Sequence, residues 1–229
     1  MTVDATPADG PRAAVMRQIA GRLAGHDPGH PLRVGIDGVC GVGKSTFADE
    51  LASALASEGR AVVLLDSDGF HHIRARRYRQ GRDSARGYYD DAYDFGALAD
   101  QVLRPLGPGG GLIYAAKVHD LATDAVVTEA TAKAAPDAVV LLAATFIQRG
   151  DLRALWDEVV YLDATEEAAL ARGIARDASA LGGAAAARTA YDARYMEACR
   201  IYLREEQPLT KASIVVEHTD PAAPVLIRW

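Results

Sequence analysis

Apolar residues near the start of the chain recur at helical spacing. Val15, Ile19 and Leu23 fall on one stripe of a helix, which we expect to end before Gly25. Two prolines that follow soon after stop any continuation of this helix. We therefore predict an N-terminal helical extension over residues 1–31, whose first ten residues are frayed.

From residue 32 onward, short apolar runs alternate with amphipathic stretches. Such runs are typical of strands that are buried on both faces of a parallel sheet. The alternation predicts an α/β fold with a parallel sheet and helices on both of its faces. The predicted strands are 33–37, 61–66, 138–143, 158–163 and 214–217, and the predicted helices are 44–57, 95–106, 165–177 and 191–203.

Three further segments have weaker patterns. A turn rich in proline and glycine covers 107–111. After it, 113–118 and 125–128 are expected to form a small strand pair off the main sheet. The segment 178–187 is rich in alanine and glycine, and we expect it to be mobile between two helices.

Composition narrows the partners of the protein. The chain has 229 residues, 49% of them hydrophobic, and a net charge of -6, which argues against a nucleic-acid-binding surface. Its two cysteines cannot form a disulfide framework, and they suit a reducing compartment. The longest apolar run, 138–147, is about half a membrane span, and no signal-like stretch stands at the start. We expect a soluble cytoplasmic protein with no membrane partner.

A glycine-rich loop follows the first predicted strand and opens the next predicted helix. Residues 38–45 read Gly-Val-Cys-Gly-Val-Gly-Lys-Ser and fit the phosphate-loop pattern in its required context. Lys44 would reach the β- and γ-phosphates, and the Ser45 hydroxyl would bind Mg²⁺. The expected nucleotide-binding residues are Gly38, Val39, Cys40, Gly41, Val42, Gly43, Lys44, Ser45 and Thr46.

The absence of asparagine from the chain indicates which nucleotide base is bound. GTPases read guanine with an N-K-x-D motif, and this chain contains no asparagine. We therefore expect ATP together with Mg²⁺.

A carboxylate-rich segment follows the second predicted strand. Residues 66–72 read Asp-Ser-Asp-Gly-Phe-His-His, with Arg-Tyr-Arg at 77–79 and Tyr-Asp-Phe at 93–95. These segments, together with the phosphate loop, resemble the uridine kinase group of P-loop nucleoside kinases, which is related to phosphoribulokinase and pantothenate kinase. The resemblance extends from about residue 33 to residue 224.

This resemblance implies a P-loop kinase domain over 32–229, with a small helical lid near 172–195. It implies that Asp68 accepts the proton of the attacked hydroxyl, and that Arg172 and Arg176 close on the phosphates as catalytic residues beside Lys44. It also implies a nucleoside-like small-molecule substrate and leaves a homo-oligomer open. The expected substrate-binding residues are Asp68, His71, Asp91, Tyr93, Tyr114, Asp120 and Arg149.

Each assignment competes with a purely structural one. Asp68 could cap a turn, and His71 could be an ordinary loop histidine. Arg172 and Arg176 could pair with acidic residues on a solvated helix face. The tyrosines of 191–203 are more consistent with packing than with base stacking.

The chain departs from the family pattern at the end of the strand 138–143. Ala143 stands where the family has the acid that helps to hold Mg²⁺, and an alanine cannot bind a cation. Asp66 or Asp37 could supply the missing charge, and we take Asp66 with Ser45 as the metal ligands. The leading hypothesis is an ATP-dependent nucleoside kinase; the alternatives are a nucleotide-binding pseudokinase and a kinase of a non-nucleoside alcohol such as ribulose phosphate or pantothenate.

Overall fold

Six strands form the central sheet of the computed structural model, in which residues 10–229 are described. Their order is β10-β9-β8-β1-β7-β2, and all neighbours are parallel except the pair of β10 with β9. The five predicted strands are confirmed, while β10 was not predicted because it is a largely exposed edge strand. The bounds are β1 (Leu32–Gly38), β2 (Val62–Leu65), β7 (Val139–Ala143), β8 (Glu158–Asp163), β9 (Ile214–Glu217) and β10 (Val225–Arg228).

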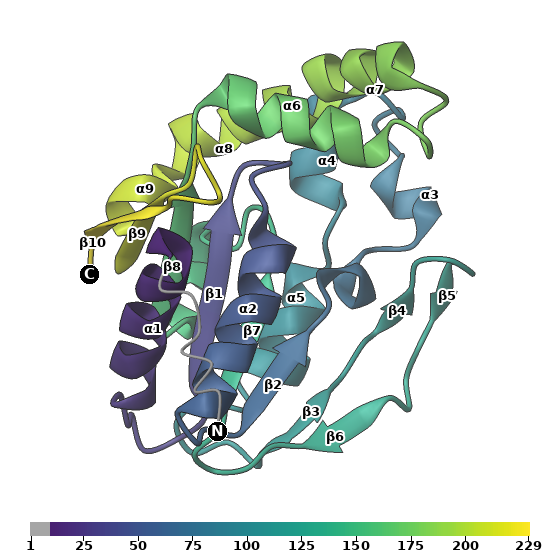
Figure 1. Cartoon of the computed structure of the whole chain (residues 1–229). Helices are drawn as coiled ribbons and strands as arrows, with labels where there is room; N and C mark the ends of the chain where they lie inside the picture. Colours follow the sequence, from purple (N-terminus) through teal and green to yellow (C-terminus); the bar gives the residue numbers. More distant parts are fainter. Residues whose placement is uncertain (1–9) are drawn as a thin grey trace, which may run out of the picture.

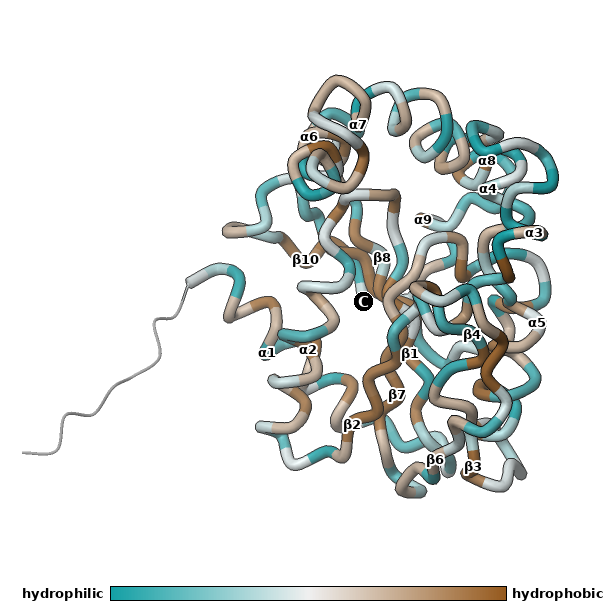
Figure 2. Tube along the Cα trace, turned by 90° about the vertical axis from the view of Figure 1, so that its right-hand side faces the viewer, coloured by the Kyte–Doolittle hydropathy of each residue, from teal (hydrophilic) through white to brown (hydrophobic). Residues whose placement is uncertain are grey.

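Helices cover both faces of this sheet, as predicted, because successive strand residues point to opposite faces. Val139 and Leu141 of β7 pack with α1 (Pro11–Ala24), α2 (Lys44–Ser57) and α8 (Met196–Glu206). Val140 and Leu142 pack instead with α5 (Phe95–Leu98) and the turn η3 (Gly150–Leu155). Figure 2 shows that the hydrophobic stretches concentrate in strands such as β1 and β7, between these two layers.

The helices α6 (Glu166–Asp177) and α7 (Ala184–Ala190) lie across the ends of the strands (Figure 1). The prediction of a mobile segment over 178–187 is wrong in its second part, because α7 begins at Ala184. Alanine is the strongest helix former, so the alanine-rich stretch folds as soon as Gly183 has set the turn. A π-helical turn, η4 (Tyr191–Tyr195), then leads into α8, where one helix over 191–203 was predicted.

The remaining short helices follow β2 and the loops after it. The predicted helix 95–106 is shorter than expected, since α5 passes into the π-helical turn η2 (Ala99–Leu103). The other short elements are η1 (Ser67–Phe70), α3 (Arg74–Arg77), α4 (Ala85–Asp91) and α9 (Pro208–Lys211).

A two-stranded arm projects beside the sheet (Figure 1). It pairs β3 (Ile113–Ala115) with β6 (Thr131–Lys133), and β4 (His119–Asp120) with β5 (Ala125–Val126). The predicted pairing of 113–118 with 125–128 is therefore wrong for β3, whose partner is β6, and holds at its end, where the Val127 amide donates to the Val118 carbonyl oxygen. The chain reverses at Asp124, whose φ is 62°, so the antiparallel register pairs β3 with the more distant β6.

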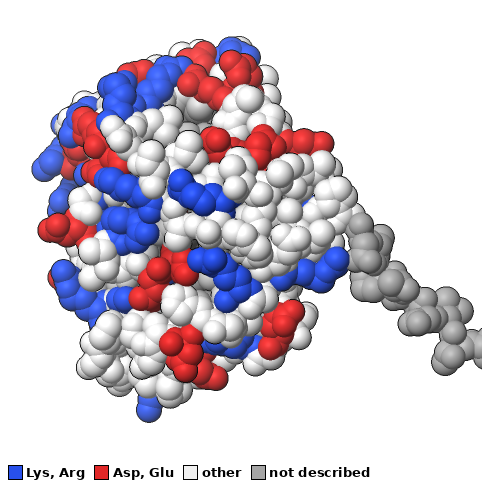
Figure 3. All heavy atoms as spheres, turned by 90° about the vertical axis from the view of Figure 1, so that its left-hand side faces the viewer, with Lys and Arg blue, Asp and Glu red and all other residues white. Residues whose placement is uncertain are grey.

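Surface charge and helix length bear on the expected partners. On the face in Figure 3, Lys and Arg side chains are interspersed with Asp and Glu. Within residues 10–229, no helix combines the length and the apolar character that a membrane crossing requires.

Candidate active site

The loop 38–45 joins the C-terminal end of β1 to the start of α2. Gly41 and Gly43 have φ values of 79° and 105°, which L side chains rarely adopt. A Cβ atom at Gly41 would lie 2.3 Å from the carbonyl oxygen of Ala169 in α6. Glycine therefore lets the loop wrap closely under the lid helix, and a wrapped backbone at a helix N-terminus suits phosphate groups.

Lys44 is the cation of this loop. Its Nζ donates to the carbonyl oxygens of Gly38 and Val39, at 2.9 Å each. Burial lowers the pKa of Lys44, and the nearby Asp37 opposes that shift. The ammonium group is thus held over the backbone cradle, where the pattern of residues predicts the phosphates.

Asp37, the second candidate for the missing metal acid, lies beneath the loop and is fully buried. Its carboxylate accepts hydrogen bonds from the Tyr202 hydroxyl, from Gln148 Nε2 at 2.8 Å and from the Gly38 amide at 2.8 Å. Burial raises the pKa of Asp37 despite these donors. Because its oxygens are engaged inside the core, Asp37 supports the loop from below and does not line the cleft.

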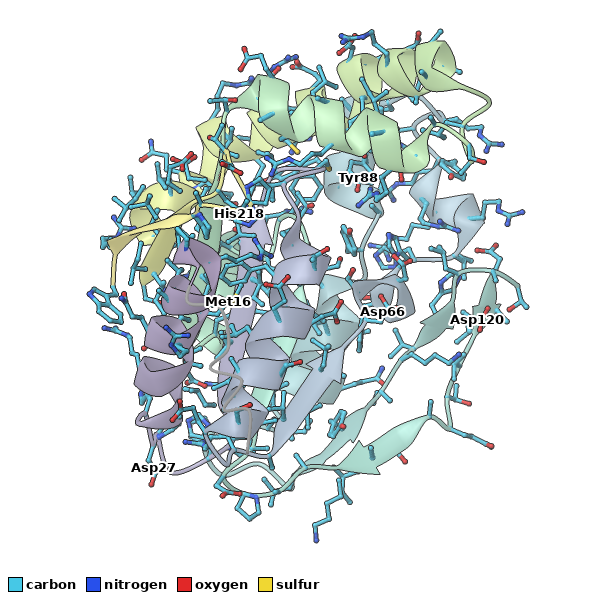
Figure 4. All side chains as sticks on the ribbon, viewed as in Figure 1. Met16, Asp27, Asp66, Tyr88, Asp120 and His218 are labelled. Carbon is cyan, nitrogen blue, oxygen red and sulfur yellow. The ribbon has the colours of Figure 1, made fainter. Side chains whose placement is uncertain are left out.

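A cleft of about 480 Å³ opens between the loop 38–45, η1, α4, α6 and η4. Figure 4 shows Asp66 and Tyr88 on elements at two sides of this region. Nine residues with predicted roles line the cleft: Cys40, Gly41, Lys44, Ser45, Asp66, Asp68, His71, Tyr93 and Arg176.

Two carboxylates stand at the end of β2, opposite the phosphate loop. Asp66 Oδ1 accepts a hydrogen bond from the Asp68 amide at 2.9 Å and so caps η1, which leaves the Asp68 side chain free of a capping role. Burial, and then the charge of Asp66, raise the pKa of Asp68. Ala143 lines the cleft on the neighbouring strand, so Asp66 is a carboxylate beside the position where the family acid is missing.

His71 packs on Tyr93, with ring centroids 4.4 Å apart. Burial and the charge of Arg77 lower the pKa of His71 to about 4. The imidazole is therefore neutral at pH 7, and it can exchange a hydrogen bond with a ligand without adding a charge.

Cys40 links the phosphate loop to α8. Its backbone amide donates to Cys199 Sγ at 3.3 Å, and both cysteines are buried and free. Hydrogen bonding with the Cys199 thiol lowers the pKa of Cys40.

His218, just after β9, supports the other side of the loop (Figure 4). Its Nδ1 lies 3.0 Å from the Val42 carbonyl oxygen, and its Nε2 lies 3.2 Å from Arg12 Nη1 of α1. No pattern in the sequence links position 218 to the loop, because the contact depends on the sheet order.

Five of the predicted catalytic and substrate-binding residues lie outside the lining of the cleft, and two of them are withdrawn into other contacts. Asp91 is 1% exposed and accepts from Arg79 Nε at 2.9 Å and from Gln80 Nε2 at 2.8 Å. Arg172 points toward β9, since its Nη1 donates to the His218 carbonyl oxygen at 3.1 Å. The spacing of Arg172 and Arg176 predicts a shared helix face, yet their side chains bend to different partners.

The other three belong to different surfaces. Tyr114 is buried in the apolar layer against the arm, and Asp120 holds Lys117 and Thr123 within the arm itself. Figure 4 shows Asp120 on the arm, apart from Asp66. Arg149 lies over the Tyr89 ring at 4.2 Å and lines a separate groove.

The cleft also contains residues to which the sequence pattern assigned no role. Arg77, Tyr78, Tyr88, Asp177 and Arg194 all line it. Arg77 and Tyr78 stand in one of the segments that carry the family resemblance. Their position in such a segment could have indicated a role in the site, but it did not distinguish residues that line the cleft from residues that only pack.

Comparison with known proteins gives a consistent family. The pattern of the phosphoribulokinase / uridine kinase family matches residues 34–220. The uridine kinase of Latilactobacillus sakei subsp. sakei (strain 23K) is 26% identical over 154 residues, which are 66% of this chain and 69% of that protein. The uridine kinase of Clostridium novyi (strain NT) is 26% identical over 150 residues, 64% of this chain and 68% of that protein.

A solved structure shares the architecture. The structure of a possible uridine kinase from Bacillus stearothermophilus superimposes with a TM-score of 0.69 at 24% identity. The match covers 89% of this chain and 97% of that one. At this identity the likeness establishes the fold, which agrees with the predicted parallel sheet and helices on both faces.

Proposed function

The chain belongs to the phosphoribulokinase and uridine kinase family, and on that premise we propose that it transfers the γ-phosphoryl group of ATP to a hydroxyl group of a nucleoside-like small molecule. The observation that carries the proposal is a single cleft lined by Lys44, Ser45, Asp68 and Arg176. A phosphate-binding loop, a carboxylate and a lid cation in one cleft are what phosphoryl transfer requires.

Asp68 is the proposed general base. The acceptor oxygen forms a bond to the γ-phosphorus, the bond from that phosphorus to the β,γ-bridging oxygen breaks, and the hydroxyl proton moves to the Asp68 carboxylate. Its side chain is 59% exposed, so an acceptor can reach it. The raised pKa of Asp68 brings the carboxylate closer to the operating pH, which favours proton transfer.

Lys44 and Arg176 would stabilise the charge that develops on the transferred group. Arg176 is held by Asp177, whose carboxylate accepts from Arg176 Nε at 2.7 Å and also from the Tyr191 hydroxyl at 2.7 Å. This pair fixes the direction of the guanidinium from the lid.

Ser45 and Asp66 would hold Mg²⁺, which neutralises phosphate charge when it is bound. Both residues line the cleft, and both line the adjoining groove together with Ala143. Within residues 10–229, no group of three His, Cys, Asp or Glu side chains could hold a metal. The donors that are present, one hydroxyl from Ser45 and one carboxylate from Asp66, fit Mg²⁺, which binds through one or two carboxylates, substrate phosphates and waters.

The test is ATP consumption with Mg²⁺ against uridine, cytidine, adenosine, pantothenate and ribulose 5-phosphate, with mass spectrometry of the product. Asp68→Asn should lower turnover at least about a hundredfold and leave ATP affinity unchanged. Asp100→Asn, an exposed acid that pairs with Arg104, is the matched control. Full activity of the Asp68 variant would refute the proposed base.

A second candidate function is nucleotide binding without transfer, and Ala143 is the observation that favours it. Ala143→Asp separates the two functions. A site that has lost its metal acid should gain transfer activity from this change. A site that uses Asp66 should gain little or be disturbed, because two carboxylates would then repel each other beside one ion.

A further inference from the structure

Part of the cleft wall consists of arginine and tyrosine side chains from α3 and η4. Arg77, Tyr78, Arg194 and Tyr195 line this part, which we call the arginine wall. We propose that the arginine wall binds an anionic group of the acceptor, so that the acceptor is an alcohol bearing a phosphate or a carboxylate. This inference rests on the proposed transfer of the γ-phosphoryl group and replaces a neutral nucleoside with an anionic alcohol as the acceptor.

Positive charge is concentrated around one ring of the wall. The guanidinium carbons of Arg82, Arg194 and Arg77 lie 4.9, 5.0 and 5.6 Å from the centroid of the Tyr78 ring. Like charges this close repel one another, and an aromatic face offsets only part of that repulsion. An anion bound between them would relieve it.

The wall has few counter-charges of its own. Arg77 Nη2 lies 3.1 Å from Asp124 Oδ1, but that oxygen also contacts the Arg74 amide and His119 Nε2. Across residues 10–229, neither Arg194 nor Arg82 forms an ion pair. The excess of cations over acids at this wall therefore favours an anionic ligand.

Unused donors point the same way. The Nε atoms of Arg77 and Arg194 are buried and have no hydrogen-bond partner. A buried N–H group without a partner is costly, and a guanidinium fork matches the oxygens of a carboxylate or a phosphate. A ligand oxyanion would satisfy these donors and balance the charge at once.

Two of the three acids that line the cleft are engaged away from the wall, and the third, Asp68, interacts with the charge of Arg77 but forms no ion pair with it in the described chain. Asp177 binds Arg176 and Tyr191, and Asp66 binds the Asp68 amide. They do not neutralise Arg77 or Arg194 by any direct contact in the described chain.

Three residues expected to bind a neutral nucleoside are withdrawn from the cleft, whereas His71 and Tyr93 line it. The carboxylate of Asp91, expected to hold a ribose, is buried against Arg79 and Gln80. Tyr114 and Asp120 belong to the arm. The cleft thus offers cations where a nucleoside kinase of the expected type would offer a ribose-binding acid.

Arg77 and Arg194 could instead serve the phosphates of ATP, and the first experiment separates the two uses. The full chain is saturated with Mg²⁺ and a non-hydrolysable ATP analogue, and inorganic phosphate is titrated by calorimetry. We expect one phosphate to bind, and Arg77→Gln or Arg194→Gln to weaken it at least about tenfold with unchanged affinity for the analogue. Arg188→Gln, which removes an exposed charge paired with Asp192 in the same lid, is the control and should change phosphate affinity less than about twofold.

The inference is overturned if wild-type protein binds no phosphate, if both variants bind it normally, or if they lose affinity for the ATP analogue. Arg194→Lys is the second variant, should Arg194→Gln fail to fold. It keeps the charge and removes the fork, so it should still weaken phosphate binding.

The second experiment uses acceptors in matched pairs: ribulose 5-phosphate with ribulose, and pantothenate with panthenol. We expect the anionic member of a pair to have at least about tenfold higher kcat/KM, and Arg194→Gln to abolish the preference. A preference in the ribulose pair would indicate a site for a phosphate, and a preference in the pantothenate pair would indicate a site for a carboxylate. Turnover of uridine with a KM that Arg194→Gln leaves unchanged would refute the anion site and keep the kinase. Phosphate binding as expected, without transfer to any alcohol, would refute the kinase and keep the site.

Discussion

At one end of the cleft, eight consecutive residues, 38–45, form the phosphate loop; we call this the nucleotide end. At the other, which we call the acceptor end, side chains from η1, α3, α4 and η4 meet across more than a hundred positions of sequence. The nucleotide end depends on backbone shape and one lysine, whereas the acceptor end depends on which side chains the tertiary fold turns inward. Family membership therefore constrains the first end much more tightly than the second.

The largest effect is expected at the nucleotide end. Lys44→Ala should lower kcat/KM for ATP about a thousandfold, because it removes the half-buried cation at the proposed phosphate site. The measurement is steady-state turnover together with binding of a fluorescent ATP analogue. Lys117→Ala, which removes a lysine that pairs with Asp120 in the arm, should retain activity. Equal losses in both variants would show that the fold, and not the loop, is affected.

A smaller loss is expected where the two ends meet. Asp66→Asn should lower turnover about a hundredfold at limiting Mg²⁺ and much less at saturating Mg²⁺, because it removes the proposed metal carboxylate. A titration of Mg²⁺ against rate distinguishes this from Asp68→Asn, whose loss should not depend on Mg²⁺. An Asp66 variant with an unchanged Mg²⁺ requirement would refute Asp66 as the metal carboxylate and leave the kinase in place.

The acceptor end should also make the fold sensitive to acid. The pKa of His71 is about 4 in the folded chain and about 6.5 when unfolded, so the unfolded state binds the additional proton between these values. Its contribution to stability is complete above pH 6.5 and is lost as the pH falls toward 4.

Denaturant titrations at pH 7 and pH 4.5 should show that His71→Gln removes about 2 kcal/mol of this acid destabilisation. His30→Gln, at a histidine whose pairing partner is Asp157 and which lies outside the cleft, is the control. An equal loss of stability in wild type and His71→Gln would contradict the neutral, buried state of His71.

The fold and the nucleotide end were predictable because their patterns are local. The strands are continuous apolar runs, and the loop 38–45 carries its own turn residues. The acceptor end was predicted less well: Asp91 and Arg172 belong to matching motifs, but neighbours distant in sequence, such as the His218 carbonyl group, decide where their side chains point. The withdrawal of Asp91 and the charge around Tyr78 depend on contacts that no spacing encodes.

The smallest expected effect concerns two arginines of one helix, and it tests whether tertiary neighbours decide which side chains face the cleft. Arg176 lines the cleft, whereas Arg172 donates to the Ala168 carbonyl oxygen within α6 and to the His218 carbonyl oxygen beside β9, although the two arginines stand one turn apart on α6. Arg176→Gln should therefore lower kcat about tenfold with little change in the stability of the fold, because it removes one charge-assisted contact in the transition state. Arg172→Gln should lower kcat less than about threefold and act mainly on thermal stability, since its hydrogen bond to the His218 carbonyl oxygen ties α6 to the end of β9. Single-turnover rates and melting temperatures of the two variants provide the comparison. Equal losses of kcat would mean that the lid moves on closing enough to bring Arg172 to the phosphates, and the division between a cleft-facing and a sheet-facing arginine would then fail.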